Sequence, residues 1–284
     1  MAQKAGMVPL EGATLPPMLR STYPLLLIGA LALGSCGTTP PPADPADGVD
    51  PSIAAAQGEA RAGRIRTGPA GESALFGGIA AEGRPGDFKL YNDRVQFIIQ
   101  DAYRSHGYID TGGNIIDADL VRAGNELGRD PFDDFFLSNG LGWLFHAEEV
   151  AVVADGSDNS VARVRAQGHF VLWDFIHGAI ESETPIIAEA PVDITLDYSL
   201  APDSSTLEFE AHFSNPGFDT ARFNPAFGFL GSDEDLWHWA SGLGLNPPPF
   251  EEAAAVGVVG RWGEAAFTIW KTEGELRPLG LAEL

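Results

Sequence analysis

The stretch "VDITLDYSLAPDSSTLEFEAHFS", residues 192–214, decides the fold class of this chain. In both halves of the stretch apolar residues alternate with polar ones, and the "APDSS" between the halves is typical of a turn. An apolar residue at every second position indicates a β-strand that buries one face. We therefore predict a β-hairpin whose core-facing residues are Val192, Ile194, Leu196, Tyr198 and Leu200 in the first strand and Leu207, Phe209, Ala211 and Phe213 in the second.

The same alternation predicts three further hairpins. "DFKLY" pairs with "RVQFIIQ" around residues 92–93, "EVAVVA" with "VARVRAQG" around "DGSDNS", and "AAVGVVGRW" with "AAFTIWKT" around residues 263–264. Each pair is separated by Asn, Asp, Ser or Gly, the residues that turns require for backbone reasons. Repeated hairpins of this kind are typical of sandwich folds.

Helical patterning is confined to short pieces. In "DPFDDFFL", Asp130 at the N-cap, Pro131 at the first helical position and Asp133 in the first turn predict one short helix. The fold class that follows is mostly β: an antiparallel β-sandwich, or its larger supersandwich form, with one or two short helices.

The N-terminal segment predicts secretion. Residues 24–34 form an apolar run preceded by Arg20, which is too short to span a bilayer but suits a signal peptide. The run ends in Leu33-Gly34-Ser35-Cys36, which resembles the bacterial lipoprotein box, whose cysteine sulfur receives diacylglycerol. We therefore predict a lipoprotein signal peptide over residues 1–36 and lipidation of Cys36. The alternative is an ordinary cleaved signal with an incidental cysteine.

The lipoprotein resemblance also implies a location. In that family an Asp after the cysteine retains the protein at the inner membrane, whereas Gly37 stands here. The resemblance thus implies a lipid-anchored protein of the cell envelope, at the outer membrane where the cell has one. Because Cys36 is the only cysteine of the chain, no disulfide is expected and the core alone must hold the fold.

Composition divides the remainder of the chain into two parts. Prolines and acidic residues dominate residues 37–72, which predicts an extended, solvated tether. Residues 73–284 predict a single β-sandwich domain, expected to end at or beyond Leu284. The formal net charge of −23 opposes binding to phosphate backbones, so nucleic acid is excluded as a partner. The same charge leaves membrane attachment to the lipid on the cysteine.

Four runs carry a family resemblance: "GRPGDFKLYNDRVQFIIQ" (83–100), "GGNIIDADL" (112–120), "VVADGSDNSVARVRAQG" (152–168) and "ITLDYSLAPDSSTLEFEAHFSN" (194–215). They resemble the N-terminal β-rich region of long bacterial cell-surface lipoproteins, which continue into β modules of the carboxypeptidase-regulatory type. That resemblance implies location and modular architecture but no chemistry. More faintly, the meandering hairpins are similar to sugar-binding supersandwiches of the galactose-mutarotase type, although no catalytic motif of that family is present.

Two acidic motifs are candidate cation sites. Asp155, Ser157, Asp158 and Asn159 are oxygen donors of the type that Ca²⁺ takes, although the same residues build hairpin turns. Asp117 and Asp119 share one face of an extended segment, as a cation site or a catalytic pair would require. The alternative for the second motif is a solvated strand face.

The segment "DEDLWHWASG" predicts a ligand site. Trp237 and Trp239 could stack on sugar rings, with His238 between them and Asp233 and Asp235 accepting hydrogen bonds from hydroxyls. We expect this segment to form a loop at a sheet end and to prefer a neutral or cationic ligand. The alternative is that both indoles cap the core.

Three function classes follow from these features. The first is a surface domain that binds a carbohydrate or another envelope component, and the second is a structural module without a ligand. The third is a sugar-active enzyme on a supersandwich. The chain has no G-x-S-x-G, H-E-x-x-H or phosphate-binding glycine motif, which excludes several common enzyme classes.

Overall fold

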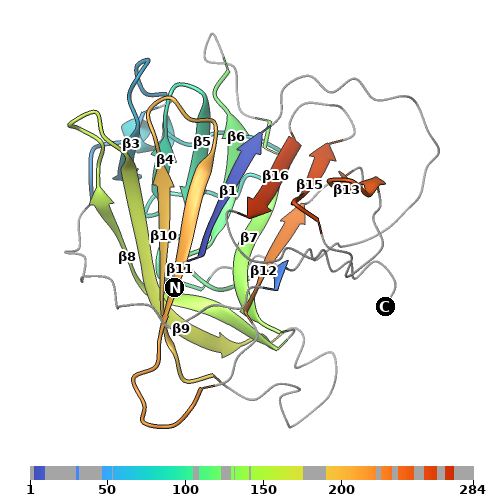
Figure 1. Cartoon of the computed structure of the whole chain (residues 1–284). Coiled ribbons are helices and arrows are strands. Elements are labelled where there is room, and N and C mark those ends of the chain that lie inside the picture. Colours follow the sequence, from blue (N-terminus) through green and yellow to red (C-terminus); the bar gives the residue numbers. More distant parts are fainter. Residues whose placement is uncertain are drawn as a thin grey trace.

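The computed structural model is a mostly β, antiparallel sandwich-type fold with almost no helix, as the sequence predicts (Figure 1). It describes residues 3–9, 30–31, 47–52, 54–104, 109–122, 129–130, 132–140, 142–174, 190–221, 225–231, 236–245, 253–260 and 266–271. The elements are β1 (Gln3–Pro9), β2 (Ala30–Leu31), β3 (Arg61–Arg64), α1 (Pro69–Glu72), β4 (Phe88–Tyr91), β5 (Val95–Ile99), β6 (Ile115–Leu120), β7 (Phe132–Asn139), β8 (Trp143–Ala154), β9 (Ala162–Leu172), β10 (Asp193–Leu200), β11 (Leu207–Ser214), β12 (Pro225–Gly231), β13 (Leu236–Ala240), β14 (Gly244–Leu245), β15 (Ala255–Gly260) and β16 (Ala266–Lys271).

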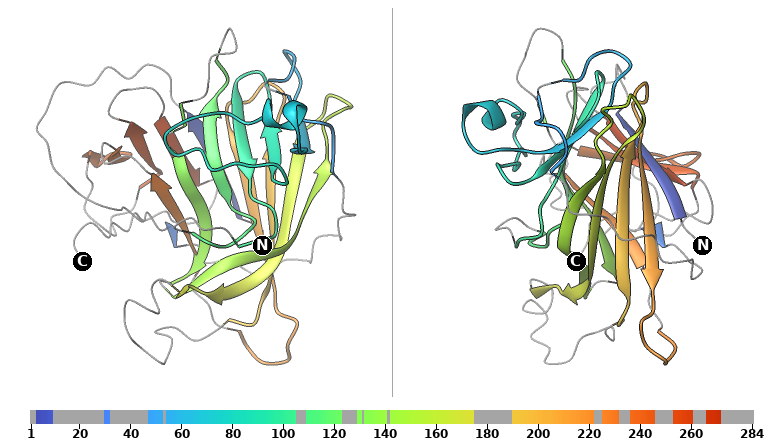
Figure 2. Two further views of the ribbon diagram at one scale, coloured as in Figure 1. Left: turned by 180° about the vertical axis from the view of Figure 1, so that it is seen from behind. Right: turned by 90° about the vertical axis from the view of Figure 1, so that its left-hand side faces the viewer.

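The strands form one antiparallel sheet that folds over on itself. Its order is β14-β13-β15-β16-β1-β11-β10-β9-β8-β7-β6-β5-β4-β3, with β12 pairing beside β7 and β2 beside β12. Strands β3 to β7 lie in one layer and β8 to β11 in the other, as the turned views show (Figure 2). Strand β3, at the end of the path, also contacts the second layer. Its Ala62 N–H donates to the carbonyl of Asp155, which follows β8, at 3.1 Å.

Aromatic rings from the two layers meet in the core. The ring of Phe209 on β11 contacts Phe135 on β7 and Phe227 on β12, with both centroid distances 4.8 Å. The hydroxyl of Tyr198 on β10 donates to the Gly113 carbonyl, which precedes β6, at 2.8 Å. Tyr198 and Phe209, which the hairpin alternation points inward, therefore contact residues from outside the predicted hairpins.

The register of the hairpin at residues 192–214 is as predicted. Tyr198 pairs with Phe209 between β10 and β11. The core-facing positions of the second strand are buried at Leu207, Phe209 and Ala211, and Phe213 packs against the core while partly exposed. The other three predicted hairpins are β4/β5, β8/β9 and β15/β16.

The helix predicted in "DPFDDFFL" is wrong. Residues Phe132–Asn139 form β7, which pairs along its length with β12. The Oδ1 atom of Asp130 accepts the Phe132 N–H at 2.8 Å, so this aspartate closes a turn before a strand. Local capping residues favour a helix, but pairing with a strand about 90 to 100 residues later prevails, because it buries Phe132, Phe135 and Phe136.

The predicted tether is wrong at its C-terminal end. Residues Arg61–Arg64 form β3, in which Ala62 is fully buried, and Pro69–Glu72 form α1. Residues 65–86 lie over the outer face of β4 to β6, so part of the predicted tether belongs to the folded domain (Figure 2).

The predicted leader contributes two strands to the structure. Strand β1 lies between β11 and β16, and β2 pairs with β12, so the sheet described here contains residues that cleavage before Cys36 would remove. Cys36 lies outside the described residues, so its lipidation stays a prediction. Within the described part of the chain, no helix has the length and apolar character needed to cross a membrane.

Candidate functional site

The predicted ligand segment is a strand and not a loop. Residues Leu236–Ala240 form β13, which pairs with β14 on one side and β15 on the other. Trp237, His238 and Trp239 are therefore placed by a β-ladder, and the expectation of a loop here is wrong. Their side chains, and residues Asp233 and Asp235, lie outside what the structure describes, so the sugar-stacking hypothesis stays a prediction.

The predicted calcium residues form the turn between β8 and β9. Oδ1 of Asp155 accepts the Ser157 N–H at 2.8 Å, and Oδ1 of Asp158 accepts the Ser160 N–H at 3.0 Å. Asn159 has a left-handed φ of 62°, which Asn tolerates in turns. These carboxylates order the turn, as the alternative interpretation expects, and calcium binding there stays a prediction.

Asp117 and Asp119 do not form a solvated strand face. Their exposed fractions on β6 are 0% and 1%, and they have different partners. Asp117 accepts the backbone N–H groups of Glu82 and Gly83 at 2.7 and 2.9 Å. Asp119 pairs with the Arg122 side chain and accepts the Arg129 N–H at 2.7 Å. Each carboxylate is thus occupied by its own neighbours.

Two further acidic side chains are buried near Asp117. Asp130 and Asp134 have exposed fractions of 0% and 3%. Burial raises the pKa of both carboxyls well above their usual range, and the nearby Asp117 raises them further. Among the described residues, no group of three or more His, Cys, Asp or Glu side chains is arranged to hold a metal ion.

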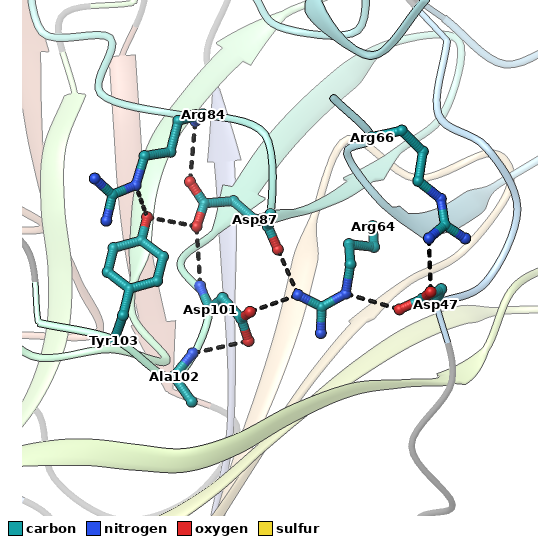
Figure 3. Close-up of polar contacts among 9 residues, drawn as sticks. Asp47, Arg64, Arg66, Arg84, Asp87, Asp101, Ala102 and Tyr103 are labelled. Carbon is teal, nitrogen blue, oxygen red and sulfur yellow. Dashed lines mark hydrogen bonds and ion pairs between the residues drawn. The ribbon is translucent and has the colours of Figure 1, made fainter. Parts of the chain in front are cut away.

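A polar network fixes the ends of β3 to β5 (Figure 3). The Tyr103 hydroxyl donates to Oδ1 of Asp87 at 2.6 Å and accepts from Nε of Arg84 at 2.7 Å, while the Arg84 guanidinium stacks over the Tyr103 ring. Arg64 donates to Oδ1 of Asp47 at 2.7 Å and pairs with Asp101. Burial raises the pKa of Asp87, and burial together with Asp87 raises that of Tyr103. The groups bind one another, so the network ties residue 47 to the sheet.

A lysine side chain is also buried, on β4. Lys89 on β4 is fully buried, and its ammonium donates to the carbonyls of Ser52 and Ala74 at 2.9 and 2.7 Å. The rings of Phe76 and Tyr91 lie within cation–π distance. Burial lowers the pKa of Lys89 to about 7. Lys89 therefore joins the segment before β3 and the residues after α1 to the sheet.

A hollow lies at the open end of the β10/β11 hairpin. Its volume is about 340 Å³, and it is lined by Val192, Phe213, Asn215, Gly217, Phe218, Asp219, Thr220 and Ala221. The Phe218 side chain is fully exposed beside the hollow. The loop is ordered by Asn215, whose amide donates to the Asp219 carbonyl at 2.7 Å and accepts the Gly217 N–H at 2.9 Å.

Sequence reasoning missed both this hollow and the burial of the polar side chains on β4 and β6, which are Lys89, Asp117 and Asp119 and are here called the buried polar layer. The sequence signal for the hollow is the "NPGFDT" that follows β11. Its Asn, Pro and Gly are typical of a turn, so Phe218 is not part of an alternating strand and is not expected to face the core. The buried polar residues have no local signal, because their cover comes partly from the predicted tether, at Ser52, and partly from residues 74–83, which carry no strand alternation.

Comparison of the chain with protein-family models, curated proteins and solved structures finds no match.

Proposed function

We propose that this protein is a lipid-anchored protein of the bacterial cell envelope whose β-sandwich binds a neutral glycan. The observation that carries the proposal is the hollow beside Phe218. The Phe218 ring offers an apolar face beside the hollow on which a sugar could stack, and loops on a rigid β scaffold are common binding positions.

The hollow has the mixed character that a sugar requires. Val192, Phe213 and Ala221 supply apolar walls for the C–H faces of the ring, and Asp219 and Thr220 supply polar atoms for its hydroxyls. The net charge of −23 disfavours an acidic glycan, so a neutral one is preferred. The buried carboxylates on β6 and β7 do not open into this hollow, which makes the sugar-active enzyme a weaker alternative.

Replacing Phe218 by Ala is expected to weaken glycan binding about tenfold, which corresponds to about 1.4 kcal/mol of lost stacking. The measurement is a glycan array to find the ligand, followed by titration calorimetry with the wild type and the variant. The matched control is Ile79→Ala, which removes another exposed apolar side chain far from the hollow along the chain.

Two results would contradict the placement of the site. If Trp237→Ala with Trp239→Ala abolishes binding and Phe218→Ala has no effect, the glycan binds at β13 instead. If the wild type binds nothing on the array, the structural-module alternative replaces the binding function.

The anchor has its own test. We expect cells that express the wild type to incorporate labelled palmitate into this protein, and Cys36→Ser to lose all of the label, because the only sulfur that can accept diacylglycerol is then absent. The readout is autoradiography of the immunoprecipitated chain, with Ser35→Ala as the control next to the same site. Label that persists in Cys36→Ser would show attachment elsewhere.

A further inference from the structure

Residues 77–87, here called the strap, cross the outer face of β5 and β6 and fit closely against it. A Cβ atom added to Gly78 would lie 2.2 Å from the Asp130 backbone nitrogen, and one added to Gly83 would lie 2.4 Å from Cδ1 of Ile98. The Ala80 N–H donates to the Asp130 carbonyl at 3.1 Å. The strap is thus held by backbone contacts to the segment before β7 as well as by Asp117.

The side chains under the strap are carboxyls that solvent does not reach. Asp117 and Asp130 have exposed fractions of 0%, and Asp134 has 3%. Oδ2 of Asp130 is buried and makes no hydrogen bond of normal geometry to the described residues, and the nearby Ala118 N–H only partly offsets the effect of burial on the pKa of this carboxyl. An ionised oxygen without a donor is costly in such a position, whereas a protonated carboxyl is tolerated.

The groups that face these carboxyls are mostly acidic. The strap contributes Glu82, Arg84 and Asp87, and β7 contributes Asp133. On β6, Asp119 also faces Asp130, but Arg122 neutralises it. Lys89 on β4 lies under the neighbouring residues 74 and 76. Carboxyls therefore outnumber the cations that could stabilise their ionised forms.

We propose that the strap is a proton-controlled cover. It stays closed over β5 and β6 while the carboxyls beneath it keep their protons, and it loosens when they ionise. Opening would expose the polar face of these strands, Asp117 included. The cover is independent of the glycan site, which lies at the end of β11.

The direction of the pH effect follows from linkage between folding and protonation. Burial raises the pKa of Asp117 to about 7 from the usual 3.8 and outweighs the Glu82 and Gly83 N–H groups, which lower it, so the closed form keeps a proton that the open form releases. The stabilisation from this group is complete below about pH 4 and is lost as the pH rises through 7. Burial lowers the pKa of Lys89 to about 7, and this opposite shift stabilises the fold as the pH rises from 7 towards 10.5. A local measurement on the strap therefore separates the two effects.

The test is hydrogen exchange of the full chain at pH 5 and pH 8, followed by mass spectrometry and corrected for the intrinsic pH dependence of exchange. We expect peptides of the strap to lose about tenfold in protection at pH 8, while peptides of β10 and β11 keep theirs. Equal protection of the strap at the two pH values would overturn the proposal, as would a loss shared by the whole chain.

The variant Asp130→Asn sharpens the test. Its amide oxygen can still accept the Phe132 N–H, but the side chain no longer ionises, so the strap is expected to lose less protection at pH 8 than in the wild type, and the remaining loss reports the ionisation of Asp117. Asp203→Asn, at an exposed turn position, is the matched control and should behave as the wild type. Circular dichroism checks that each variant folds. If Asp130→Asn does not fold, the comparison of the wild type at pH 5 and pH 8 still tests the proposal. A last arm adds Ca²⁺ or Mg²⁺ to the wild type at pH 8. If either ion restores the protection seen at pH 5, the carboxyls hold a cation, which would overturn control by protons.

Discussion

Replacing Phe209 by Ala is expected to lower the free energy of unfolding by about 3–5 kcal/mol. Phe209 is 2% exposed, and its ring contacts Phe135 and Phe227 in the opposite layer. Truncation removes these contacts and leaves a cavity that the two layers cannot close without moving. Urea denaturation followed by circular dichroism measures the change.

The matched control for Phe209→Ala is the neighbouring residue of the same strand. Glu208 on β11 is exposed, so Glu208→Ala should change the free energy of unfolding by no more than about 0.5 kcal/mol. Similar losses in the two variants would mean that the strand does not present alternate residues to core and solvent, and the register of the hairpin would have to be revised.

This hairpin was predictable because its signal is local. A one-residue slip would move every apolar side chain of β11 from the core to solvent, so alternation alone specifies the register. "DPFDDFFL" shows the opposite case. Its Asp and Pro fit a helix start, yet Phe132, Phe135 and Phe136 are buried by strands whose arrangement no short window contains.

The buried polar layer was unpredictable for a related reason. Asp117 and Asp119 alternate with apolar residues, and such a pattern ordinarily places polar groups in water. Whether that face meets water depends on residues 65–86, which lie about 30 to 50 residues earlier in the chain and carry no strong apolar period. The sequence can therefore identify the face of a strand but not what covers it.

The outer face of β9 and β10 hides a second polar contact with a large expected effect. Arg165 and Asp197 are directly opposite each other and form a bidentate ion pair, with Nε to Oδ1 at 2.6 Å and Nη2 to Oδ2 at 2.7 Å. Their side chains are only 5% and 6% exposed. Removing one partner of a buried pair leaves an uncompensated charge.

We therefore expect Asp197→Ala to lower the free energy of unfolding by about 3–5 kcal/mol, measured by urea denaturation at neutral pH. The apolar double variant Arg165→Met with Asp197→Leu should lose far less, because neither charge then remains buried. Ser199→Ala is the control on the same face, where Arg163 donates from Nε to the hydroxyl at 2.9 Å, and it should lose about 1 kcal/mol. If Asp197→Ala loses no more than Ser199→Ala, water reaches the Arg165 guanidinium, and the face beneath this ion pair is solvated. If the double variant is as unstable as Asp197→Ala, the loss does not come from an unpaired buried charge. The attraction between Arg165 and Asp197 would then itself hold β9 to β10.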